Sequence, residues 1–341
     1  MPDAPFFLLI CADANEQIGA GHAVRSLALA QEWIEQGGRA TLFGQVSLVW
    51  VQRELSSSGV SYIESNKSQR SITVSELVSR FPEIQTGNSW LCLDGYEFSL
   101  QLLQDLREDN INVLLLDDMG EKKFCPADII LNQNLNAENR YNYPNAKAQL
   151  LGSSYSLLRR AIVQDSLQFR GSKDEDIISI LVGLGAADNT EDLTNVISKI
   201  EKCILANEQP FELLIIPGSS RIEEIESSSN KDFDIQVLKR PQDIIEFYRR
   251  ANLAVIAAGS SCWELMLYKL PLLLVKLAEN QEVVFDELIS VGLAQSFSQK
   301  NLQDAISLIS SEDAYDDRVY PVDGYGAMRT VNRMLSPIRE R

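Results

Sequence analysis

The chain has 341 residues, of which 45% are hydrophobic and 23% charged, a globular composition that excludes disordered and collagen-like chains and predicts about two domains. Its 48 acidic and 31 basic residues give a net charge of −17, which argues against a nucleic-acid partner because phosphate binding requires a positive surface. No apolar run approaches the roughly 20 residues of a membrane span, and Asp3 stands where a signal peptide would carry Lys or Arg, so we expect a cytoplasmic monomer without a membrane partner.

Short apolar runs alternate with segments of helical period, which is typical of parallel sheets covered by helices. In the first half, strands are expected at residues 6–11, 40–44, 90–93, 113–116 and 128–131, and helices at 23–36 and 100–107. In the second half, strands are expected at 177–182, 211–216, 235–238, 253–257 and 272–277, and helices at 193–206, 243–250, 262–268, 283–291 and 301–309. The fold class is therefore α/β, with two doubly wound halves.

The boundary between the halves is expected within residues 157–176, a polar and charged stretch that contains a Gly-Ser pair. A last amphipathic helix is expected from about Tyr325. We therefore predict an N-terminal domain at 1–160, a C-terminal domain at 161–324 and a terminal helix at 325–341.

The first expected strand leads through a loop containing Gly19 and Gly21 to His22, the only histidine of the chain. Glycines before a helix let backbone N–H groups approach an anion, although neither a complete GxGxxG fingerprint nor a GK[ST] sequence is present. His22 is a candidate general base at this strand end; the alternative is that it caps or packs the helix. Arg25 is a candidate ligand for a phosphate or carboxylate, or else a solvent-exposed helix charge.

Acidic residues follow three of the expected strands: Asp13, Asp94 and the pair Asp117 and Asp118. Because the carboxyl ends of parallel strands meet at one edge of a sheet, the first three are candidates to orient His22, hold a water or bind sugar hydroxyls. A divalent metal would need a converging ligand set that the sequence does not reveal. Asp118 is expected to be a turn or N-cap residue.

In the second half, Gly259, Ser260 and Ser261 join an expected strand to a helix that carries Glu264. Small residues and hydroxyls suit a diphosphate, and a carboxylate one turn into the helix can accept hydrogen bonds from both ribose hydroxyls. The alternative for Ser260 is simple helix capping.

Three other strand ends of the second half carry glycine or amide residues. Asn280 and Gln281 follow the strand at 272–277, where their amides can bind hydroxyl or acetamido groups, unless Asn280 only caps a helix. Gly185 and Asp188 follow the first strand of this half and are candidates for the same ligand, whereas Gly218 is expected to form a plain turn.

The five cysteines lie tens of residues apart, without a CxxC pair. This spacing argues against a zinc site, and the odd number argues against a complete disulfide framework. We expect buried thiols and no metal or other cofactor.

Together these motifs resemble the UDP-sugar hydrolases of pseudaminic acid biosynthesis and their relatives in spore coat polysaccharide synthesis. The motifs span nearly the whole chain in the order in which the family carries them. One of them, AAGSSxWEL at 257–265, is also shared with the lipid II-forming N-acetylglucosaminyltransferase. The matching segments are DANEQIGAGHAVR at 13–25, LDGY at 93–96, LLGSSYSLLRR at 150–160, AAGSSCWEL at 257–265, AENQ at 278–281 and DGYGAMR at 323–329.

The resemblance implies a GT-B fold, in which two Rossmann-like domains with parallel sheets face across a cleft, the C-terminal domain holds the nucleotide and the last helix returns to the first domain. It implies that water attacks the anomeric carbon of UDP-2,4-diacetamido-2,4,6-trideoxy-β-L-altropyranose, or of a related sugar, with inversion and release of UDP. His22 would be the general base, and Asp13 and Tyr96 would line the sugar site. The residues implied to hold UDP and its sugar are Ser260, Ser261, Glu264, Asn280 and Gln281.

Two positions depart from the family pattern. Cys11 stands where the family usually has arginine, and Ala186 stands in a run where the family has a second glycine. One alternative is a GT-B glycosyltransferase that uses a UDP-sugar donor. The other is a nucleotide-sugar binding protein without turnover, for which Cys11 is the best argument.

Overall fold

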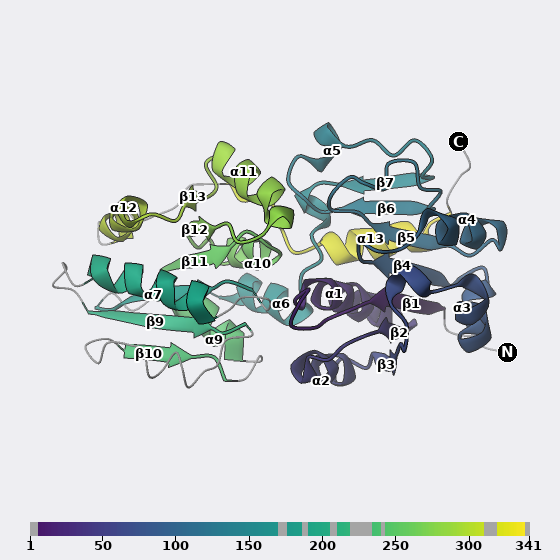
Figure 1. Ribbon diagram of the computed structural model, residues 1–341, viewed down its shortest axis with the longest axis horizontal. Helices are drawn as coiled ribbons and strands as arrows, with labels where there is room; N and C mark the ends of the chain where they lie inside the picture. Colours follow the sequence, from purple (N-terminus) through teal and green to yellow (C-terminus); the bar gives the residue numbers. More distant parts are fainter. Residues whose placement is uncertain are drawn as a thin grey trace. The chain divides into compact units, whose positions relative to one another are not determined.

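The computed structural model describes residues 6–169, 176–185, 190–204, 210–218, 234–239, 243–309 and 319–337. The chain divides into two compact units, Met1–Arg160 with Asp323–Arg341 and Ala161–Val322. Each unit is built on one parallel sheet with helices packed against it (Figure 1).

The first unit contains a seven-stranded sheet in the order β3-β2-β1-β4-β5-β6-β7. Every residue of β1, β4, β5 and β6 is buried, which explains why these strands read as continuous apolar runs in the sequence. The strands are β1 (Phe7–Ala12), β2 (Arg39–Gly44), β3 (Ser61–Glu64), β4 (Trp90–Asp94), β5 (Val113–Leu116), β6 (Ile129–Asn132) and β7 (Ala148–Leu151).

Helices cover this sheet and connect its strands. The longest, α1 (Gly21–Glu35), buries Ala23, Leu27 and Ala30 at helical spacing. The last helix of the chain, α13 (Gly326–Leu335), packs against α1 in the same unit and is drawn in yellow in Figure 1. The other helices are α2 (Val49–Ser57), α3 (Val74–Arg80), α4 (Leu100–Glu108) and α5 (Ala137–Arg140), with 3₁₀ turns η1 (Gln69–Ser71), η2 (Pro82–Gln85) and η3 (Ser153–Tyr155).

The second unit contains a six-stranded parallel sheet in the order β10-β9-β8-β11-β12-β13. Its strands are β8 (Ile178–Gly183), β9 (Phe211–Ile216), β10 (Asp234–Val237), β11 (Leu253–Ala257), β12 (Leu272–Val275) and β13 (Gln295–Ser296). Its helical segments are α6 (Arg160–Gln168), α7 (Thr190–Ile204), α9 (Ile244–Arg250), α10 (Ser261–Leu267), η5 (Glu279–Gln281), α11 (Glu282–Ser290) and α12 (Gln299–Ile309).

Both sheets have the strand order of a doubly wound fold, in which the chain reverses direction across the sheet after its third strand. The reversal lies between β1 and β4 in the first unit and between β8 and β11 in the second. Ligands of such folds bind at the carboxyl ends of the two strands that flank the reversal. These two positions define where a site is to be sought in each unit.

The two units divide between Arg160 and Ala161, within the stretch 157–176 where the boundary was expected, and this stretch also contains the helix α6. Only Ile162 of α6 is fully buried, which gives a weak apolar signal. The helix is instead held through Asp165, which pairs with Arg249 and accepts a hydrogen bond of 2.7 Å from the hydroxyl of Tyr268. Polar contacts of this kind leave no hydrophobic periodicity in the sequence.

All five cysteines are free and buried, as expected. In the part of the chain that the structure describes, no helix combines the length and the apolar character needed to cross a bilayer.

Candidate active site

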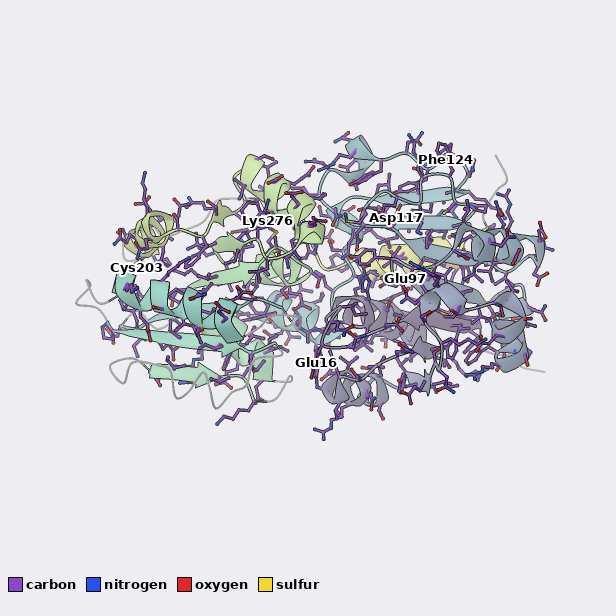
Figure 2. All side chains as sticks on the ribbon, viewed as in Figure 1. Glu16, Glu97, Asp117, Phe124, Cys203 and Lys276 are labelled. Carbon is purple, nitrogen blue, oxygen red and sulfur yellow. The ribbon has the colours of Figure 1, made fainter. Side chains whose placement is uncertain are left out.

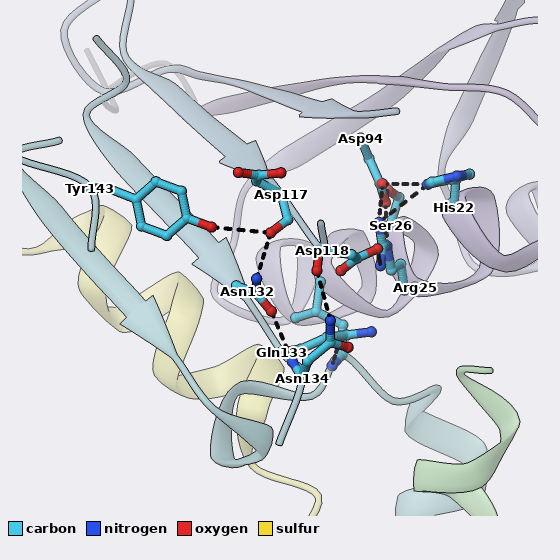
Figure 3. Close-up of polar contacts among 11 residues, drawn as sticks. His22, Arg25, Ser26, Asp94, Asp117, Asp118, Asn132, Gln133, Asn134 and Tyr143 are labelled. Carbon is cyan, nitrogen blue, oxygen red and sulfur yellow. Dashed lines mark hydrogen bonds and ion pairs between the residues drawn. The ribbon is translucent and has the colours of Figure 1, made fainter. Parts of the chain in front are cut away.

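His22 lies in the first turn of α1, beside the carboxyl end of β4. Its Nδ1 atom is 2.7 Å from Oδ1 of Asp94, the last residue of β4 (Figure 3). Asp94 is 0% exposed. Burial opposes its charge, but the guanidinium of Arg25 and the imidazole of His22 outweigh burial and hold the pKa of Asp94 well below its usual range. An ionised carboxylate only accepts hydrogen bonds, so Nδ1 of His22 carries a proton, and in the neutral imidazole Nε2 then carries the lone pair.

Arg25 lies one turn further along α1 and completes this cluster. Its Nε and Nη2 atoms donate to the two carboxylate oxygens of Asp94, at 2.8 and 2.6 Å, and its Nη1 atom donates to Oδ2 of Asp118 at 2.6 Å. Ser26 donates a further hydrogen bond of 3.0 Å to Asp94. Although burial disfavours a charge, the carboxylates of Asp118 and Asp94 raise the pKa of Arg25 well above its usual value.

These contacts select among the roles expected for these residues. Orienting His22 was one role expected for Asp94, and binding a carboxylate was one expected for Arg25, and the two residues are buried and bonded to each other. Asp118 was expected to be a turn or N-cap residue, but its carboxylate is the second partner of Arg25. The three residues therefore form the support of His22, and the alternative of a solvent-exposed Arg25 is excluded by its exposure of 6%.

Two buried asparagines at the end of β6 hold the loop that carries Asp118, and the sequence analysis missed both. Asn132 donates through Nδ2 to the backbone carbonyl of Asp117 at 2.6 Å, and Asn134 donates through Nδ2 to that of Asp118 at 2.9 Å. The available signal was the sequence Asn-Gln-Asn directly after an apolar strand, because polar residues that are buried there must satisfy a neighbouring backbone.

Tyr96 lies beside the histidine. Its ring meets the imidazole of His22 edge-on, with the ring centroids 4.9 Å apart, and 42% of its surface is exposed. Two exposed acids lie in the loops of this strand edge: Glu97 directly follows Tyr96, and Glu16 is in the loop before α1 (Figure 2). Tyr96 therefore combines contact with His22 and access to solvent, which a residue lining a sugar site requires.

Asp13 follows β1 at the same edge of the sheet. Its carboxylate accepts a hydrogen bond of 2.7 Å from the backbone of Gln45. Burial raises its pKa, while this hydrogen bond and the imidazole of His22 act in the opposite direction. Asp13 thus lies near the histidine but does not bond to its Nδ1 atom. It therefore remains a candidate for the sugar site.

The two glycines of the loop before α1 have different roles. Gly19 has a φ of +78° and exchanges backbone hydrogen bonds with Asn15, a conformation that favours glycine. Gly21 is the first residue of α1, after Ala20 at the N-cap. The alternative that His22 caps the helix is therefore wrong, since Ala20 occupies that position.

In the second unit, the loop between β11 and α10 exposes its backbone. A Cβ atom added at Gly259 would meet nothing within 4 Å, and the same holds for Gly185, which has a φ of +97°. Ser260 occupies the N-cap position of α10 without a side-chain capping hydrogen bond, and Ser261 is exposed. Ser260 is therefore the N-cap residue, as the alternative expected, but its hydroxyl is not used for capping, and the backbone at Gly259 is open to a ligand.

Glu264 and Gln281 are held in place by contacts within the second unit. Glu264 is 6% exposed and accepts a hydrogen bond of 3.0 Å from the hydroxyl of Tyr248. The side-chain oxygen of Gln281 accepts one of 2.9 Å from the backbone of Leu277. Two other predicted residues, Asp188 and the side chain of Asn280, lie outside the described residues.

The paired acids expected as possible metal ligands are bonded otherwise. Asp117 accepts a hydrogen bond of 2.9 Å from the backbone of Lys122, and Asp118 pairs with Arg25. Over the described ranges, no three or more histidine, cysteine, aspartate or glutamate side chains gather in a group that suits a metal ion.

Cys11, at the position where the resembled family has arginine, is part of the core. It is 1% exposed in β1, between Phe43 of β2 and Leu93 of β4. Burial raises the pKa of its thiol, so it packs as a neutral apolar residue. The other departing position, Ala186, lies outside the described residues.

No family model matches the chain. The chain is 20% identical over 290 residues to the uncharacterized protein MJ1062 of Methanocaldococcus jannaschii, and the match covers 82% of this chain. The chain spans only 57% of the length of that relative.

Solved structures show a stronger likeness. UDP-GlcNAc 2-epimerase of Neisseria meningitidis, bound to UDP-GlcNAc, matches with a TM-score of 0.65 at 10% identity, over 97% of this chain and 100% of that one. The corresponding epimerase of Methanocaldococcus jannaschii gives a TM-score of 0.61 at 13% identity, over 96% and 99%. MurG of Acinetobacter baumannii gives 0.58 at 14% identity, over 97% and 99%. These likenesses, together with the two parallel sheets, confirm the predicted fold class of two Rossmann-like domains of the GT-B type.

Proposed function

We propose that this protein is a UDP-sugar hydrolase that releases UDP from UDP-2,4-diacetamido-2,4,6-trideoxy-β-L-altropyranose, or from a related diacetamido sugar, with inversion at the anomeric carbon. The observation that carries the proposal is the hydrogen bond of 2.7 Å between Nδ1 of His22 and the buried carboxylate of Asp94. The sequence motifs favour the hydrolase, and the similar structures include UDP-GlcNAc 2-epimerases that were solved with UDP-GlcNAc.

The chemistry assigned to His22 is that of a general base. As the oxygen of a water molecule bonds to the anomeric carbon, Nε2 of His22 accepts a proton from that water, and the bond between the carbon and UDP breaks. The bonding electrons leave with UDP, and the sugar keeps the new hydroxyl. Asp94 holds the imidazole in the required tautomer and stabilises the imidazolium that forms.

The contacts with UDP are assigned to the second unit. The open backbone at Gly259 and the hydroxyls of Ser260 and Ser261 suit the diphosphate, which needs donors and close approach. Glu264, oriented by Tyr248, is assigned to the ribose hydroxyls. Tyr96 and Asp13 are assigned to the sugar, together with the amides of Asn280 and Gln281.

NMR of the purified protein with the altropyranose substrate in H₂¹⁸O, without an added acceptor, tests this function. We expect UDP release, inversion of the anomeric proton signal and ¹⁸O in the sugar. His22→Asn should lower turnover by roughly 10²–10⁴-fold, the usual contribution of a general base, and leave the affinity for UDP unchanged. The exposed Gln17→Asn, in the loop before α1, is the matched control. Release that requires an acceptor would indicate a glycosyltransferase, and binding without release would indicate a binding protein.

A further inference from the structure

The cluster behind His22 contains one residue whose role is not explained by a histidine and aspartate pair alone. Asp118 comes from the loop after β5, and its Oδ2 atom lies 2.6 Å from Nη1 of Arg25. Among the described residues, its other oxygen, Oδ1, is buried without a hydrogen-bond partner. A buried carboxylate oxygen without a hydrogen-bond partner costs free energy, which calls for an explanation.

We propose that Asp118 is a positioning residue that fixes the tautomer of His22 by directing the hydrogen bonds of Arg25 to the two carboxylates and not to Nδ1 of His22. The proposal rests on the proposed function only for its kinetic readout. Asp118 makes no contact with His22 in the structure, so its effect passes through Arg25.

The geometry creates a competition for Nδ1 of His22. This atom lies 2.7 Å from the carboxylate of Asp94 and also 3.2 Å from Nη2 of Arg25. With the proton on Nδ1, His22 donates to Asp94 and Nε2 is free to act as a base. With the proton on Nε2, Nδ1 would accept from Arg25, and Nε2 could not remove a proton from water. The position of the guanidinium therefore decides which nitrogen is the base.

Asp118 favours the productive arrangement. Asp118 accepts a hydrogen bond from Nη1 of Arg25, so the guanidinium lies between two carboxylates. In this position Nη2 of Arg25 lies 2.6 Å from Oδ1 of Asp94. Two carboxylates and one guanidinium also leave one net negative charge beside His22, which stabilises the imidazolium formed in the reaction. Without Asp118, that charge would be lost and the guanidinium would be free to turn toward Nδ1.

Hydrogen bonds within the protein hold the loop that carries Asp118. Asn134 donates to the backbone carbonyl of Asp118, and its own backbone donates to Oδ1 of Asn132 at 3.1 Å. Figure 3 shows this network running from the end of β6 to α1. Asp118 therefore stands on a rigid support, as an orienting residue must.

The other groups at this edge of the sheet cannot replace it. Asp13 bonds the backbone of Gln45, and Tyr96 presents its ring to His22. Asp117 bonds the backbone of Lys122. Asp118 is thus the carboxylate other than Asp94 that contacts Arg25 among the described residues.

The test compares Asp118→Asn with Glu121→Gln, a matched control that removes one exposed negative charge from the same loop. The first readout is the ¹⁵N spectrum of the single histidine without substrate, at about pH 9, where an ordinary imidazole is neutral. We expect Nδ1–H in the control and a population with Nε2–H in Asp118→Asn. The second is hydrolysis, for which we expect kcat to fall roughly 10- to 100-fold, as when an outer partner of a functional histidine is lost, with KM unchanged. Asp118→Glu should restore part of both.

An unchanged tautomer and an unchanged kcat in Asp118→Asn would overturn the inference, even if the enzyme hydrolyses its substrate. A changed tautomer in a protein that hydrolyses nothing would instead leave the inference standing and refute the proposed function. If circular dichroism shows that Asp118→Asn does not fold, Arg25→Lys provides the second variant, because one ammonium group cannot bridge both carboxylates in the same way. An unchanged tautomer of His22 and an unchanged kcat in that variant would likewise overturn the inference.

Discussion

The two units place different chemistry at the same position of the same fold. At the carboxyl edge of the first sheet, four ionisable side chains are bonded to one another: the buried His22, Arg25 and Asp94, and the partly buried Asp118. At the corresponding edge of the second sheet, the glycines Gly185 and Gly259 leave the backbone open.

The difference indicates a division of tasks. A buried and fully oriented charge cluster suits proton transfer, because its dipoles need no rearrangement during the reaction. An open backbone suits a ligand that must approach the chain closely, such as a diphosphate. One strand order thus supports two kinds of site, and the residues at the strand ends decide which kind each unit carries.

The largest expected effect comes from removing the charge of Asp94 in the first unit. Asp94→Asn should lower kcat by about 10³–10⁴-fold, because the imidazole loses the acceptor that fixes its tautomer. Steady-state kinetics with UDP release as the signal will measure it, with the exposed Asp109→Asn as control. Equal turnover in the two variants would show that Asp94 does not orient the base.

The same substitution also predicts a pH dependence of stability. The pKa of Asp94 lies below its unfolded value, so its charge stabilises the fold above about pH 4, and this stabilisation is lost as the pH falls through the folded pKa. At neutral pH the free energy of unfolding should be about 3 kcal/mol lower in Asp94→Asn than in the wild type. Urea unfolding should show this gap narrowing below about pH 4, and a gap that widens on acidification would contradict the assignment.

A smaller effect is expected in the second unit. Glu264→Gln should weaken UDP binding about 10-fold, because a charged acceptor of the ribose hydroxyls is replaced by a neutral one. Titration calorimetry with UDP will measure this, and Glu246→Gln, on the exposed side of α9, is the control. If Glu264→Gln binds UDP as tightly as the control, the ribose assignment is wrong.

The smallest expected effect tests the open loop. A Cβ at Gly259 or at Gly87 would meet nothing within 4 Å, so alanine at either position should leave the fold intact. Only Gly259→Ala should weaken UDP binding, by about 3- to 10-fold, because its methyl group would occupy the space assigned to the diphosphate. An equal affinity for UDP in both variants would contradict the assignment of the diphosphate to the loop at Gly259.

Much of the sheet architecture could be predicted because its central strands are continuous apolar runs. The two edge strands of the first sheet could not, since β3 has no buried residue and β7 only one. Such strands lack the hydrophobic pattern on which prediction depends.

The candidate site was predicted only in part. His22 and Asp94 could be placed together because both follow buried strands, and parallel strands bring their carboxyl ends to one edge. The contact between Arg25 and Asp118 joins residues 93 positions apart. It depends on side-chain direction and on a loop held by Asn132 and Asn134, neither of which has a periodic signal in the sequence.

The measurement that tests the central claim most directly is the ¹⁵N spectrum of the wild-type protein labelled on its single histidine, at about pH 9, where an ordinary imidazole is neutral. The account predicts a proton on Nδ1 of His22 and an unprotonated Nε2, the nitrogen assigned as the base. A proton on Nε2 would contradict it, because His22 could then not accept a proton from water.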